Sequence, residues 1–184
     1  MNGIDLMIEE HRYIKRMLVV LRKASYRILQ GEPVVYDDFY NMADFVKTYA
    51  DDHHHGKEEQ LLFNRMVDEL GDTGEVIIKN GMLVEHDMGR FYMAELKKAL
   101  ASVAQGHDEA KIDVIANAVG YASLLSRHID KEDHVVYRFA QRELSPETLA
   151  QIDAQCADFE AKQTEKKVQD HYIHLLESLE KNYL

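Results

Sequence analysis

An internal repeat restricts the possible folds of this chain more than any other feature of its sequence. Residues 54–63 read HHGKEEQLLF and residues 128–137 read HIDKEDHVVY, so both follow His-x-x-Lys-Glu-acidic-x-aliphatic-aliphatic-aromatic. Upstream, MIEEH ends at His11 and MLVEH ends at His86. The two copies lie 74 or 75 residues apart at each of these positions. Each half is therefore predicted to contain a helix with one His, followed by a helix with His-x-x-x-Glu.

Apolar residues recur at helical spacing along most of the chain. Turns rich in Gly, Pro or Asp separate these stretches, and the pattern predicts helices over about 4–29, 37–70, 75–104 and 109–143. Asp72 and Glu75 resemble a capping box at the start of the third helix. The predicted fold class is all-α, with four long antiparallel helices in an up-down-up-down four-helix bundle.

A fifth helix is predicted after the bundle, because Ser145 and Pro146 form a typical helix start. Residues 160–167 are polar throughout, so a kink is expected there. We therefore expect a metal-binding bundle over residues 1–143 and a C-terminal helical extension over residues 144–184. The extension would pack on the bundle or form the contact of a homodimer, since its apolar stripe would otherwise be exposed.

Composition excludes several classes of function. The formal net charge of −11 argues against a nucleic-acid partner and against binding to an anionic membrane. The single cysteine, Cys156, leaves no Cys-x-x-Cys site for zinc or an iron–sulfur cluster, and we expect it to be a buried thiol. No signal-peptide pattern and no apolar run of membrane-spanning length is present, so the expected location is the cytoplasm.

Ten histidines in an acidic helical chain require an explanation, and the repeat supplies one. Residues four apart lie one turn apart on the same face of a helix, so a His and a Glu at this spacing can reach neighbouring metal ions. Four inward-facing helices would bring two single histidines and two His/Glu pairs to one level. The predicted ligands are His11, His54, Glu58, His86, His128 and Glu132.

The predicted donors suit a pair of iron ions. If Glu58 and Glu132 each bridge both metals, each metal has two imidazoles, two carboxylate oxygens and one shared oxo or hydroxo oxygen. Imidazole and carboxylate donors with an open position favour non-haem iron over structural zinc, and manganese or a mixed pair would also fit. The alternative interpretation is that these side chains face solvent or hydrogen-bond within the core.

The register of the second helix depends on the repeat. His54 pairs with Glu58 because His128 pairs with Glu132. The competing pair, His55 with Glu59, has no counterpart, because Ile129 occupies the matching position. His53 and His55 are therefore expected at the surface or around the ligands.

The pattern His…His-x-x-x-Glu…His…His-x-x-x-Glu resembles the hemerythrin-like, or HHE cation-binding, family over about residues 4–140. This resemblance implies a di-iron site that binds or senses a small diatomic ligand, dioxygen or nitric oxide. It also leaves open a di-iron enzyme acting on peroxide, oxygen or nitric oxide, or an iron donor for cluster repair. Arg90 stands where oxygen carriers have a further His. Gly89, beside it, either leaves room for the ligand or allows close helix packing.

Overall fold

The computed structural model describes residues 2–165 and 167–184, which are almost entirely helical and contain no strand. The predicted all-α fold class is confirmed. The α-helices are α1 (Gly3–Leu29), α2 (Tyr36–Phe45), α3 (Asn64–Glu69), α4 (Gly71–Ile77), α5 (Leu83–Ala104), α6 (Lys111–Lys131), α7 (Tyr137–Glu143), α8 (Pro146–Glu165) and α9 (Val168–Tyr183). Within the described residues, no helix is both long enough and apolar enough to cross a membrane.

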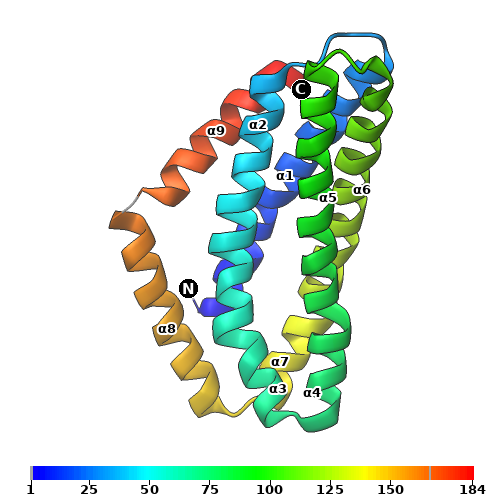
Figure 1. Cartoon of the computed structure of the whole chain (residues 1–184). Coiled ribbons are helices and arrows are strands. Elements are labelled where there is room, and N and C mark those ends of the chain that lie inside the picture. Colours follow the sequence, from blue (N-terminus) through cyan, green and yellow to red (C-terminus); the bar gives the residue numbers. More distant parts are fainter. Residues whose placement is uncertain (1, 166) are drawn as a thin grey trace.

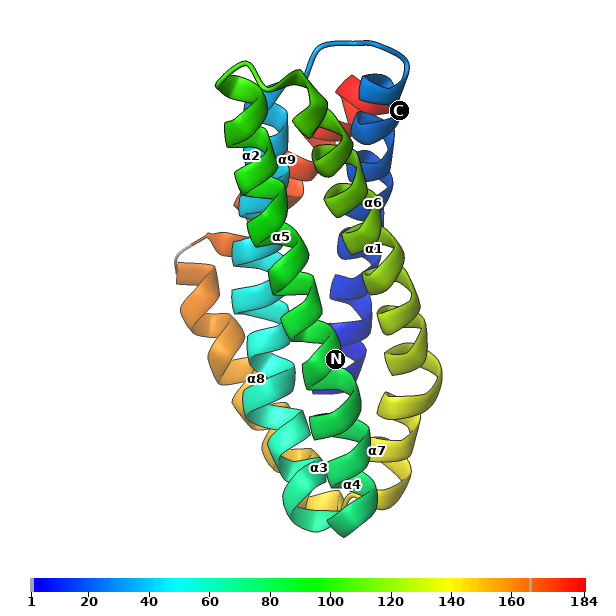
Figure 2. The ribbon, with the colours of Figure 1, turned by 45° about the vertical axis from the view of Figure 1, so that its right-hand side comes forward.

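Short π-helical or 3₁₀ segments join most of these helices into longer rods. The π-helical segments are η1 (Val46–His55), η2 (Glu58–Phe63), η3 (Ile78–Met82) and η5 (Glu132–Val136), and η4 (Asp108–Ala110) is 3₁₀. The chain thus forms four rods: α1, residues 36–69, residues 71–104 and residues 108–143. Figures 1 and 2 show the rods side by side, with consecutive rods running in opposite directions.

Three of these four π-helical segments lie where the repeat carries its His/Glu ligand pairs. His54 is in η1, Glu58 begins η2 and Glu132 begins η5. A π turn inserts an extra residue into an α-helix, and such turns are frequent at functional sites. The sequence pattern predicted helix here but contained no signal for the wider turns.

The connection between the second and third rods is shorter than predicted. Gly71 adopts a left-handed φ of +55°, which reverses the chain at one residue, and α4 begins there. Asp72 is consequently already helical, and no side chain caps the start of α4. The predicted capping box of Asp72 and Glu75 is therefore wrong.

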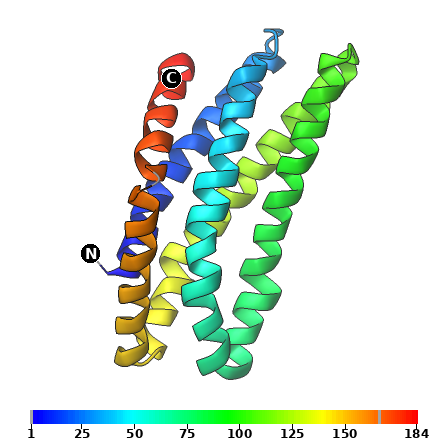
Figure 3. The same ribbon diagram turned by 60° about the vertical axis from the view of Figure 1, so that its left-hand side comes forward.

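Two helices, rather than one, follow the fourth rod. Lys167 has a left-handed φ of 55°, so α8 ends before it and α9 begins after it, within the polar stretch where a kink was predicted. Figure 3 shows α8 and α9 end to end along the side of α1 and of the second rod. Ile152 and Cys156 of α8 are buried there, and Cys156 is thus the core thiol that was expected.

The apolar core is divided into two layers by buried polar side chains. On α1, Met7 belongs to one apolar cluster and Ile14 to the other, and the buried His11 lies between them. Along the second rod, Ala50 and Leu62 belong to different clusters in the same way. Burying polar groups between apolar layers is costly unless each group has a partner. The partners of this middle layer therefore indicate what the layer is for.

Candidate metal centre

The structure brings together all six residues that the repeat predicts as ligands. Each is buried, and they come from all four rods: His11, His54, Glu58, His86, His128 and Glu132. Their ligand atoms form two overlapping groups, in each of which every atom lies within 4.8 Å of the others. One group consists of His11, His54, Glu58 and Glu132, and the other of His55, Glu58, His86 and His128. Glu58 is common to both groups.

The four predicted histidines form two pairs. Nε2 of His11 lies 2.8 Å from Nε2 of His54, and Nε2 of His86 lies 3.0 Å from Nε2 of His128. Each pair joins neighbouring rods, and each is placed equivalently in one copy of the repeat. Two imidazoles whose nitrogens point to one place can bind the same cation.

The other ring nitrogen of each of these histidines faces a carboxylate just outside the cluster. The Nδ1 distances are 2.7 Å from His11 to Asp133, 2.8 Å from His54 to Glu10, 2.7 Å from His86 to Glu59 and 2.8 Å from His128 to Glu85. An Nδ1–H that donates to a carboxylate fixes the tautomer and leaves the Nε2 lone pair facing inward. This arrangement is typical of metal-binding histidines.

These four outer carboxylates were missed in the sequence, although the repeat contains them. Glu10 and Glu85 each precede the single His of their half, while Glu59 and Asp133 each follow the predicted ligand Glu. Every outer carboxylate therefore has a counterpart about 75 positions away. Extending the repeat by one residue on each side of the ligands would have found them.

The paired nitrogens need a positive charge between them. Two neutral imidazoles that donate from Nδ1 are both acceptors at Nε2, so only a proton or a metal cation makes such a close pair favourable. Burial opposes protonation of His128, but the carboxylates of Glu132, Glu85 and Glu58 together outweigh burial and raise the pKa of His128 to about 10. Burial and the charge of His11 together lower the pKa of His54 to about 4.

The two central carboxylates also call for positive charge. Glu58 and Glu132 are fully buried, and three of their four oxygens have no hydrogen-bond partner among the described residues. Oε1 of Glu58 accepts a hydrogen bond from the Tyr137 hydroxyl. Burial and the neighbouring Glu132 raise the pKa of Glu58 well above its usual range. Buried carboxylates without donors are costly unless they are paired or bind metal.

Cationic side chains hold the outer carboxylates in both halves. Lys15 contacts Asp133 at 3.5 Å, and its repeat counterpart Arg90 contacts Glu59 at 2.7 Å. The structure thus pairs each of these cations with an outer carboxylate. Their contacts add a further layer that orients the ligand histidines.

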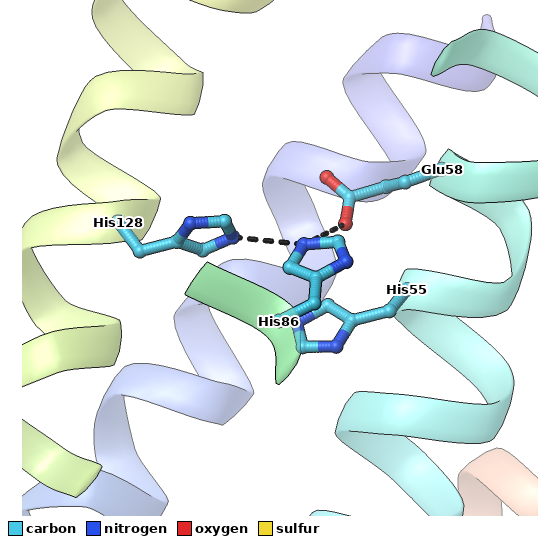
Figure 4. Close-up of side chains that lie close together, drawn as sticks. All are labelled: His55, Glu58, His86 and His128. Atoms are coloured by element: carbon cyan, nitrogen blue, oxygen red, sulfur yellow. Dashed lines mark hydrogen bonds and ion pairs between the residues drawn. The ribbon is translucent and has the colours of Figure 1, made fainter. Parts of the chain in front are cut away.

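His53 and His55 were expected at the surface or around the ligands, and the structure shows both buried around the ligands. Successive helical residues point about 100° apart, and both can be buried only because separate elements cover their sides of the rod. Nε2 of His53 lies 3.0 Å from Glu10 and its ring packs against Phe159 of α8. His55 instead stacks on His86 of α5, with ring centroids 3.8 Å apart (Figure 4).

A cavity of about 380 Å³ reaches this centre between the second rod and α5. His55, His86, Gly89, Arg90 and Tyr121 are among the residues that line it. A Cβ built at Gly89 would lie 3.4 Å from the Tyr121 ring, which is an ordinary van der Waals contact, so helix packing does not require a glycine here. Gly89 lines the cavity, and of its two interpretations the structure supports the one in which it leaves room for a ligand.

The donor set fits a pair of cations. It offers inward-facing imidazole nitrogens in two groups and two carboxylates between them, of which Glu58 reaches both groups. A third cluster, made of Glu10, His53 and Glu160, already surrounds the ammonium group of Lys57 and so is an ion-pair network.

Comparison with known proteins agrees with this chemistry. Proteins described as uncharacterized in Mycobacterium bovis and Mycobacterium tuberculosis are 23% identical to this chain over 133 residues, which is 72% of the chain. The chain spans about half the length of these relatives, 51%. The model of the hemerythrin HHE cation binding domain matches residues 2–140. Because this match covers most of the sequence, the chain belongs to the hemerythrin HHE cation-binding family.

Proposed function

We propose that this protein holds two iron ions and uses them to bind or sense a small diatomic ligand, dioxygen or nitric oxide. The proposed ligands are His11, His54, Glu58, His86, His128 and Glu132. One observation carries the proposal: outer carboxylates orient four imidazoles toward two buried carboxylates, and three of the four oxygens of this pair have no hydrogen-bond partner among the described residues.

Iron is favoured by the donor types. Imidazole and carboxylate together suit non-haem iron, while closed tetrahedral zinc sites commonly include thiolates. Cys156 belongs to neither group of donors. Two manganese ions or a mixed pair would use the same donors. Bound iron would supply electrons and open coordination positions for a small ligand.

The chain's own residues orient the donors and exclude water. The outer carboxylates keep the imidazole lone pairs directed inward, and Tyr137 fixes one oxygen of Glu58. The apolar layers on either side shield the centre from solvent. The cavity beside His86 gives a small molecule a path toward the donors. Its largely apolar lining suits an uncharged ligand such as dioxygen or nitric oxide.

The same proposal includes the architecture around the centre. Residues 1–143 would form the up-down-up-down four-helix bundle of this family, and residues 144–184 an extension on its side. Contacts of α8 and α9 with α1 and with the second rod support packing on the bundle over a dimer contact. We place the protein in the cytoplasm, as either a monomer or a homodimer.

Metal content and spectra test the proposal directly. Protein expressed with iron and purified without oxygen should contain two iron ions per chain, and its absorption should change reversibly with dioxygen or nitric oxide. The double variant His54→Ala/His128→Ala should fold and lose the iron. Two zinc ions in place of iron, or no bound metal, would contradict the proposal.

Turnover distinguishes a binding or sensing protein from the alternatives. A carrier or sensor should show reversible binding with little consumption of ligand. Repeated turnover with an added reductant would identify a di-iron enzyme instead, and transfer of iron to an apo iron–sulfur protein would identify an iron donor.

A further inference from the structure

His55 is a buried imidazole with an unpartnered ring nitrogen. Its Nδ1 has no hydrogen-bond partner among the described residues and lies 3.5 Å from Oδ1 of Asp51. That carboxylate is already engaged by Arg90 and Lys47. A buried polar atom without a partner is uncommon and calls for an explanation.

His55 lies beside the predicted ligands His86 and His128. Its ring lies parallel to that of His86, with an interplanar angle of 9°, and at 5.9 Å from the ring of His128 (Figure 4). One of its ring nitrogens lies within 4.8 Å of ligand atoms of Glu58, His86 and His128. Four buried donors at this separation form a set that one cation can bind.

The second half of the repeat has no such residue. Ile129 occupies the position that matches His55, and this isoleucine is buried as well. An isoleucine offers no donor to the pair formed by His11 and His54. Any contribution from His55 therefore makes the two cation positions chemically different.

The geometry points to His55 as a fifth imidazole ligand, on the cation held by His86 and His128. This inference rests on the proposed two-cation centre and deepens it. One cation then has three imidazole donors and the other two, so the two should bind with different affinities. The six matched donors of the repeat, without His55, would predict equal affinities for the two cations.

A variant that keeps the ring but removes its nitrogens tests the inference. His55→Phe preserves stacking on His86 and leaves no donor atom. The matched control is His53→Gln, which removes the neighbouring buried imidazole but keeps a group able to hydrogen-bond with Glu10 and Lys57. Each protein, freed of metal, is titrated with iron(II) without oxygen against a competing chelator, and X-ray absorption counts imidazole nitrogens per metal.

Wild type and His53→Gln should bind two iron ions, and His55→Phe should bind one of them at least about tenfold more weakly, with fewer imidazoles per metal. The cavity allows a second test, because free imidazole added to His55→Ala should restore the lost affinity. This rescue also applies if His55→Phe fails to fold. Unchanged affinity and imidazole number in His55→Phe, or no rescue of His55→Ala, would overturn the inference and leave the two-iron proposal intact. Failure of wild type itself to bind two ions would overturn the proposed function.

Discussion

Lys57 and Lys131 occupy matching positions of the repeat, yet replacing each by methionine should have very different effects on stability. Each ammonium group bonds the outer carboxylate of its half, Glu10 for Lys57 and Glu85 for Lys131. Lys57 is completely buried under α8 and also bonds Glu160, while Lys131 is 45% exposed. The pair of variants thus compares one interaction in two environments.

The expected magnitudes follow from burial. Removing one partner of a buried ion pair typically costs about 3–5 kcal/mol, because the other charge remains buried without compensation. Glu10 would keep its contacts with His53 and His54, and Glu160 is 17% exposed and can reach water. These two features favour the lower end, about 3 kcal/mol for Lys57→Met. An exposed pair contributes about 0–1 kcal/mol, which is the loss expected for Lys131→Met.

Urea unfolding of the metal-free proteins at neutral pH, followed by circular dichroism, measures both losses. With a slope of about 2–3 kcal/mol per molar urea, Lys57→Met should lower the midpoint by about 1 M or more. Lys131→Met should move it by less than about 0.5 M. Losses that agree within about 1 kcal/mol would refute the reasoning, since they would show that burial under α8 does not make the Lys57 network more costly to break.

Three further outcomes follow from contacts elsewhere in the fold. The hydrogen bond from Arg16 holds the pKa of Glu180 below its usual range, so this pair contributes stability above the ordinary Glu pKa and loses it as pH falls through the folded pKa. Glu180→Gln should therefore cost about 0.5–1 kcal/mol in thermal or urea unfolding at pH 7 and nothing in strong acid. Gly89→Ala should stabilise α5 by about 0.5–1 kcal/mol, whereas Gly74→Ala should cost about 1–3 kcal/mol in the same assay, because its Cβ would clash with a backbone carbonyl. Burial raises the pKa of Cys156 to about 11, so alkylation at pH 8 should be slow in folded protein and fast in urea.

The sequence was informative wherever one helix face determined the outcome. The four rods end within a few residues of the predicted positions, and the repeat chose His54 among three consecutive histidines. That choice needed only the rule that matching residues of two copies take matching places. The meeting of the six residues follows from the same rule and from helical spacing.

The histidines on either side of His54 could not be placed from periodicity. A helical pattern identifies one inward face, whereas a rod covered on several sides has several. His53 is buried because α8 covers it, and His55 is buried because α5 does. The π turns and the single-residue reversal at Gly71 were missed for a similar reason, since local sequence contains no strong signal for them.

Three departures from the repeat lie at or beside the proposed metal centre, and they make its two sides unequal. On the side of His11 and His54, α8 covers Lys57, which in turn holds Glu10 against His54. On the side of His86 and His128, Lys131 is half-exposed, and the cavity opens beside His86. His55 also lies on this side, whereas the matching position of the other copy of the repeat holds Ile129. A duplicated sequence would by itself give two equivalent cation positions. We therefore expect matched variants in the two halves, such as His11→Ala and His86→Ala, to differ in their loss of metal. Each copy of the repeat contributes the same three predicted ligands, two histidines and one glutamate. The difference would therefore come from residues 55, 57 and 144–184.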